Sequence, residues 1–173
     1  MTAFAYYRLP YLHHAHYVAQ REGEPEVLSS VAELNGKEGF VIAPFSPSSD
    51  CPVLLIHPDE SKLLPISDAK AISTSDSTLG EDASDRDAYA GAFECFHQEL
   101  EKGTFRKIVL ARKATVRTAD KDFENLFMKA CRMYPRLFVS LVYTPQSGMW
   151  LMATPEILLK GEQGNMSTMS LAG

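Results

Sequence analysis

Residues 105–116 read FRKIVLARKATV, and the expected fold is built outward from this stretch. Its β-branched and apolar residues predict a long strand, with Lys107 in the interior of that strand. A lysine in such a position usually runs along apolar surface and keeps its amine in water. Alternatively, it projects from the sheet into a pocket, where burial favours the neutral amine that can act as a base. The rest of the chain has to decide between these two interpretations.

Strand alternation places Lys107 on one face with Val109 and Ala111. The bulkier Ile108 and Leu110 lie on the other face, which is the expected core face. The smaller side chains beside Lys107 leave room for a ligand next to the amine.

The composition is that of a soluble globular protein: 173 residues, 45% hydrophobic and 23% charged, with a net charge of −5. This length favours a single domain. The negative total argues against nucleic acid as the main partner. Residues 102–121 nevertheless carry seven basic side chains and one acidic one, which favours an anionic small molecule, although solvated charge gives the same pattern.

Three scattered cysteines (Cys51, Cys95 and Cys131) are too few for a disulfide framework or a zinc site and fit a reducing compartment. The sequence shows neither a signal peptide nor an apolar run of the roughly 20 residues that span a bilayer. We therefore expect a cytoplasmic protein with no membrane partner.

The order of elements predicts an α+β fold with mostly antiparallel sheet and flanking helices. Ser84 and Asp122 begin the two main helices, and the apolar stripe of the second helix predicts core packing. Residues 68–82 are polar and predict a loop, and the histidines at 13–16 predict a solvated turn rather than a metal site. Strands are expected at 4–9 (an edge strand), 39–45, 52–57, 137–143, 149–160 and 165–171. A short helix is expected at 29–34 and a turn at 144–148, and His57 is expected to be an ordinary residue at a strand boundary.

Glu156 is the second candidate for chemistry. It follows Pro155 within an otherwise apolar strand, and proline there implies a bulge, a bend or an edge. A bulge re-aims the next side chain, whereas a lone strand glutamate usually faces solvent. A lysine and a glutamate across one pocket would supply a base and an acid.

The third candidate is the stretch SLAG at residues 170–173. Glycine after a strand lets the backbone approach a ligand and offer an amide to an anion. Gly173 is therefore a candidate substrate-binding residue.

These three segments together resemble the chorismate-utilising enzymes, and within them isochorismate synthase most closely. The resemblance lies in KIVLAR at 107–112, ATPEILL at 153–159 and LAG at 171–173. It covers about the last 70 residues closely and the N-terminal part loosely. It implies the partial anthranilate synthase component I-like fold, with residues 1–83 as a variable N-terminal region and 84–173 as the start of the catalytic core.

The resemblance also implies residue roles. Lys107 would be the general base that activates water for attack at C2 of chorismate. Glu156 would be the general acid that protonates the departing C4 hydroxyl, and Gly173 would lie in the substrate-binding turn. The reaction implied is isomerisation of chorismate to isochorismate.

Two features discriminate within the family. Relatives that use ammonia usually lack lysine at the position of Lys107, and aminodeoxychorismate synthases carry a nucleophilic lysine where this chain has Ala172. Water therefore fits better as the nucleophile. A salicylate synthase-like enzyme, or a non-catalytic module that binds chorismate or regulates, remains an alternative.

The resemblance further implies a longer complete enzyme. Its Mg²⁺-binding glutamates are expected downstream of Gly173, with no metal ligand in this chain. We therefore expect this chain to be the N-terminal part of the enzyme, inactive without the C-terminal part of the same protein. A partial sheet structure of this kind would expose an apolar face.

Overall fold

The computed structural model describes residues 2–66, 83–111, 122–157, 159–162 and 164–169. The chain divides into two compact units, each described here by itself. The first unit combines Met1–Lys70 with Asp122–Gly173, and the second is Ala71–Lys121. The predicted loop at 68–82 lies outside the described residues.

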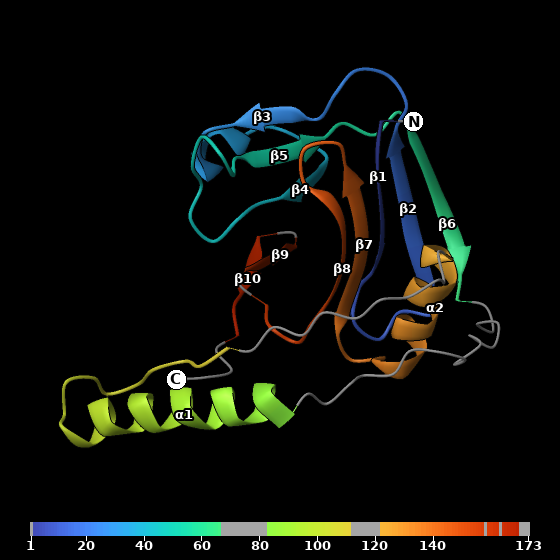
Figure 1. The fold of residues 1–173 in the computed structure, drawn as a ribbon. Helices are drawn as coiled ribbons and strands as arrows, with labels where there is room; N and C mark the ends of the chain where they lie inside the picture. Colours follow the sequence, from blue (N-terminus) through green and yellow to red (C-terminus); the bar gives the residue numbers. More distant parts are fainter. Residues whose placement is uncertain (1, 67–82, 112–121, 158, 163, 170–173) are drawn as a thin grey trace. The chain divides into compact units, whose positions relative to one another are not determined.

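A five-stranded antiparallel sheet forms the centre of the first unit (Figure 1). Each of its neighbouring pairs is antiparallel. Its strand order is β6-β2-β1-β7-β8. The strands are β1 (Ala3–Arg8), β2 (His14–Gln20), β6 (Glu60–Pro65), β7 (Phe138–Thr144) and β8 (Gly148–Thr154).

The first strand corrects two predictions. β1 was expected at an edge, but it pairs with β2 on one side and β7 on the other. Its alternating alanines, Ala3 and Ala5, are fully buried, which lets a second layer approach the sheet. The expected histidine turn was also wrong, because His14 and His16 lie in β2, where Tyr7 pairs with His16.

Helix α2 (Phe123–Met133) covers one face of this sheet. The Asp122 side chain caps it by accepting a hydrogen bond from the Asn125 backbone N–H at 3.0 Å. Phe127 and Cys131 are buried against Val139 and Leu141 of β7, which confirms the predicted apolar stripe. The burial of α2 therefore follows from its sequence period.

The C-terminal end of α2 is held by Arg8, which is only 1% exposed. Its guanidinium donates to the carbonyls of Pro135 at 2.6 Å, Tyr134 at 2.6 Å and Leu137 at 2.9 Å. These carbonyls lie where a helix has no internal donors left, and a cation is favourable there. Burial raises the pKa of the Cys131 thiol, and the positive charge of Arg8 acts in the opposite direction, lowering it.

Arg8→Met is expected to lower the free energy of unfolding by about 3 kcal/mol or more, because three inward carbonyls lose a charged donor. The control is Arg136→Met in the same turn, where the side chain is exposed and the expected change is within about 0.5 kcal/mol. Urea unfolding of both variants measures the difference. Equal stabilities would show that Arg8 does not hold the end of the helix.

A three-stranded antiparallel sheet, ordered β3-β5-β4, packs on the other face of the large sheet. Ile56 of β5 and Phe40 of β4 contact the small residues Ala3 and Ala5 of β1. The short 3-10 helix η1 (Val31–Leu34) lies between β3 and β4 in the chain, close to the helix predicted at 29–34. The strands are β3 (Glu26–Leu28), β4 (Phe40–Ile42) and β5 (Val53–Ile56).

Strand β6 was not predicted. Among the described strands it pairs with β2 alone, at the edge of the sheet, and most of its side chains are exposed. An edge strand with one neighbour needs little apolar sequence, so its polar composition gave no signal.

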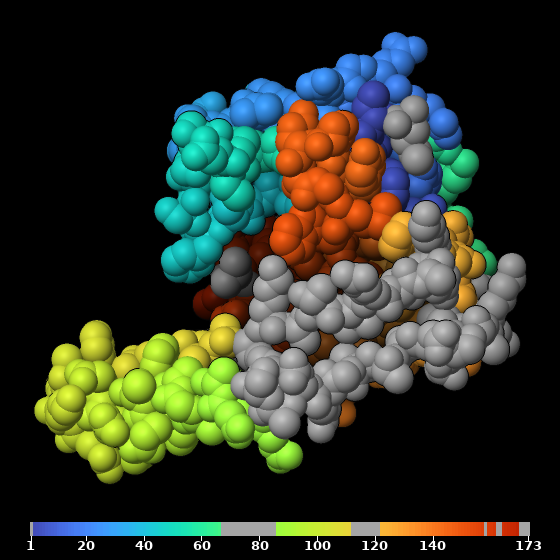
Figure 2. Space-filling model, in the orientation of Figure 1, coloured from blue at the N-terminus to red at the C-terminus, as the bar shows by residue number. Residues whose placement is uncertain are grey.

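Strand β8 lies at the opposite edge and returns from β7 through the predicted turn at Thr144–Gly148. It ends at Thr154, so the single strand expected over 149–160 is interrupted before Pro155. Figure 2 shows this hairpin, in orange, at the surface. Four consecutive apolar side chains of β8 are exposed: Met149, Trp150, Leu151 and Met152. Beyond it, β9 (Lys160–Glu162) pairs with β10 (Asn165–Ser167).

The second unit contains helix α1 (Ala83–Glu101), at the position predicted from its cap and spacing. The described part of the predicted long strand, residues 105–111, does not form a strand. A strand is stabilised by a ladder partner, and none of the described strands pairs with this segment. Residues 112–116 lie outside the described part. The part of the chain that the structure describes contains two α-helices and mostly antiparallel sheets, which confirms the predicted α+β class.

Candidate functional site

Glu156 lies two residues after the end of β8 at Thr154, in a segment that is neither helix nor strand. Its backbone N–H donates to the Thr154 hydroxyl at 3.3 Å, and its side chain is exposed. The proline therefore ends the strand instead of making a bulge within it. The carboxylate stands at the end of an edge strand, where a substrate can reach it.

The segment that carries Glu156 is hydrogen-bonded to residues 168 and 169, just before the motif at 170–173. The Met169 backbone N–H donates to the Ile157 carbonyl at 2.9 Å, and the Thr168 hydroxyl donates to the same oxygen at 3.4 Å. Ile157 and Met169 are separated in sequence by the β9–β10 hairpin but are hydrogen-bonded here. The structure thus brings the residue after Glu156 next to residues 168 and 169.

Lys107 belongs to the second unit and Glu156 to the first. Lys107 is exposed, as are Val109 and Ala111, whereas Ile108 and Leu110 are half-buried. The predicted alternation is therefore present, although the segment is not a strand. Gly173 lies outside the described residues.

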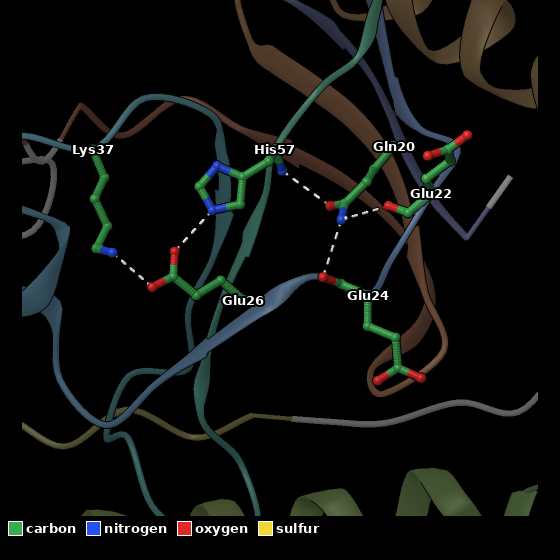
Figure 3. A network of polar contacts seen from close by, with 6 residues as sticks. All are labelled: Gln20, Glu22, Glu24, Glu26, Lys37 and His57. Atoms are coloured by element: carbon green, nitrogen blue, oxygen red, sulfur yellow. Dashed lines mark hydrogen bonds and ion pairs between the residues drawn. The ribbon is translucent and has the colours of Figure 1, made fainter.

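Sequence reasoning missed a polar network at the end of β5 (Figure 3). The His57 ring Nε2 lies 2.8 Å from a Glu26 carboxylate oxygen, and Lys37 Nζ donates to the other oxygen at 2.6 Å. The Gln20 side-chain oxygen accepts from the His57 backbone N–H at 3.0 Å. His57 was expected to be an ordinary residue at a strand boundary. Its partners are 31 and 37 residues away in sequence, so no local pattern could have revealed them.

Hydrogen bonds from Lys37 and then His57 lower the pKa of Glu26 from its ordinary value of 4.5. A lowered carboxyl pKa contributes stability that is present above the ordinary value and is lost as the pH falls through the folded-state pKa. Glu26→Gln is therefore expected to be less stable than the wild type at neutral pH, with the difference closing below pH 4.5.

Urea unfolding over a pH series measures this difference. The exposed Glu22 supplies the control variant Glu22→Gln, whose stability should stay parallel to that of the wild type. A constant gap between Glu26→Gln and the wild type at every pH would contradict the role of the ionised carboxylate.

The described residues contain no group of three or more His, Cys, Asp or Glu side chains that could hold a metal ion. They therefore do not fit a magnesium centre, and we derive no chemical step through a metal. In the same part of the chain, no helix is both long and apolar enough to cross a membrane.

The family model described as "Chorismate binding enzyme" matches residues 54–173. Comparisons with curated proteins and with solved structures gave no match. The matched range covers more than half of the chain and includes Lys107, the Thr-Pro-Glu segment and Gly173. The chain belongs to the chorismate-binding enzyme family.

Proposed function

We propose that the complete enzyme containing this chain is an isochorismate synthase, a magnesium-dependent isomerase that converts chorismate to isochorismate. The observation that carries the proposal is the family match over 54–173, which contains all three predicted site segments. Chorismate is a dianion, so the basic stretch at 102–121 supports it as the partner. The three unpaired cysteines support a cytoplasmic location.

In the proposed reaction, Lys107 takes a proton from water as the water oxygen attacks C2 of chorismate. The double-bond electrons shift toward C4, and the C4 hydroxyl leaves as water after accepting a proton from Glu156. The ring therefore gains one hydroxyl and loses another, which is an isomerisation. The exposed position of Glu156 after β8 supports a role in contact with substrate.

We propose a binding role for the turn that contains Gly173. Its support is the pair of bonds from Met169 and Thr168 to Ile157, which hold the preceding residues beside the Glu156 segment. An acid and a backbone donor placed together would engage the leaving hydroxyl and a nearby carboxylate of the same substrate.

Product analysis tests the proposal. The complete protein is incubated with chorismate and Mg²⁺, and the products are separated by chromatography and identified by mass. Isochorismate as the accumulating product is the expected result. Salicylate with pyruvate would instead identify a salicylate synthase, and chorismate binding without turnover would identify a non-catalytic module. Omitting Mg²⁺, with a chelator present, should abolish the reaction.

A further inference from the structure

A pocket with a volume of about 390 Å³ lies in the first unit, where the three-stranded sheet packs on the large sheet. This size is in the range of small-molecule sites, which run from about 300 to 1,000 Å³. Its lining comes from β1, β2, the start of β4 and the end of β5. The lining residues are Tyr7, Val18, Glu38, Gly39, Phe40, His57 and Pro58.

Two aromatic rings form a preformed wall of this pocket. The Tyr7 and Phe40 ring centroids are 5.5 Å apart, and the Tyr7 ring also stacks on His16 at 4.8 Å with an interplanar angle of 7°. The Tyr7 ring therefore contacts both the Phe40 ring and the His16 ring. At Gly39, φ is +150°, and an added Cβ would lie 2.3 Å from the Ile56 carbonyl oxygen, so only glycine fits where β4 approaches β5.

The imidazole of His57 is fixed at both its backbone and its ring. The His57 backbone N–H donates to the Gln20 side-chain oxygen. Gln20 is only 7% exposed, and its side-chain nitrogen donates to the Glu22 and Glu24 carbonyls. The ionised Glu26 carboxylate can only accept a hydrogen bond. The proton of the bond between Glu26 and the His57 ring is therefore assigned to His57 Nε2 (Figure 3).

The charges around the pocket favour a cation. Glu38 contributes a carboxylate to the lining, whereas the Lys37 amine beside it in sequence is bound to Glu26. The pocket thus offers the Glu38 carboxylate and the rings of Tyr7 and Phe40. Aromatic faces attract cations, and a carboxylate accepts hydrogen bonds from an ammonium group.

We propose that this pocket binds a small organic cation, a compound with a protonated primary amine and one unsaturated or aromatic ring. Five of its seven lining residues precede residue 54, outside the range matched by the chorismate-binding family. None of the seven is one of the three predicted site residues Lys107, Glu156 and Gly173, so the proposal stands whether or not the proposed reaction with chorismate is correct.

The test uses three probes of similar shape: 2-phenylethylamine (cationic at neutral pH), 2-phenylethanol (neutral) and 3-phenylpropionate (anionic). Ligand-observed NMR titration against the complete protein measures each dissociation constant. The cation should bind most tightly and the anion most weakly. Equal affinities, or tighter binding of the anion, would overturn the proposal.

Variants locate the binding. Glu38→Gln should lower the affinity for the cation by about two- to fivefold, the range of a partly exposed charge pair. Phe40→Leu should weaken it by a similar factor, about two- to fivefold, through loss of the ring face. Glu22→Gln, an exposed carboxylate outside the lining, should leave the affinity unchanged. Unchanged affinity in Glu38→Gln, with an unfolding midpoint like that of the wild type, would contradict the assigned site.

Discussion

Lys107→Ala in the complete enzyme is expected to lower the rate of isochorismate formation by about 10²- to 10⁴-fold, the usual contribution of a positioned general base. The cause is loss of the amine that takes the proton from the attacking water. Lys107→Arg should be as inactive, because a guanidinium keeps its proton and cannot serve as a base. Steady-state kinetics with chorismate measures both variants.

The matched control for this prediction is Lys102→Ala. Lys102 lies in the same unit just after α1, is exposed, and pairs with Glu99 at 2.8 Å. Its removal deletes one positive charge of the basic stretch at 102–121 without touching the proposed base. Equal losses in both variants would mean that Lys107 contributes only charge, and near-wild-type activity of Lys107→Ala would remove it from the mechanism.

Glu156→Gln is expected to lower kcat by about 10²- to 10⁴-fold, because an amide of the same shape has no proton to give the C4 hydroxyl. The substrate KM should change much less, since the lost interaction is made in the transition state. The control Glu22→Gln removes an exposed carboxylate of the same unit and should keep the wild-type kcat. A raised KM with an unchanged kcat would instead make Glu156 a binding residue.

Features encoded by neighbouring residues could be predicted from the sequence. Asp122 caps α2 through the amide three residues on, and the stripe that includes Phe127 and Cys131 is buried as its period predicts. The tight turn that ends at Gly148 was predicted from its own residues. In the structure Gly148 has a positive φ of 73°, which favours glycine. Each of these features depends on contacts within one turn or one hairpin.

Features that depend on distant partners could not be predicted. Arg8 reaches carbonyls 126 to 129 residues away, and β1 becomes central only because β2 and β7 both pair with it. The segment at 105–111 has strand-like sequence and the expected alternation of exposure, yet it lacks a paired neighbour among the described strands. Strand formation requires a partner, and a single sequence does not specify which segments meet.

The candidate site shows the same division. The proline beside Glu156 predicted a bulge, a bend or an edge within a strand over 149–160, whereas β8 ends before it at Thr154. The contact between Ile157 and Met169 spans the β9–β10 hairpin and became visible only in the structure. A local property of proline therefore marked this position in the sequence, and tertiary pairing determined which segment lies beside it.

The measurement that tests the central claim most directly is turnover of chorismate by the complete enzyme, with Mg²⁺, in water enriched in oxygen-18. If water attacks C2 and the C4 hydroxyl leaves, the isochorismate formed carries a solvent oxygen at C2, and mass spectrometry detects it. Lys107→Ala should form almost none of this labelled product. Isochorismate with no solvent oxygen, or labelled product formed at the wild-type rate by Lys107→Ala, would contradict the account.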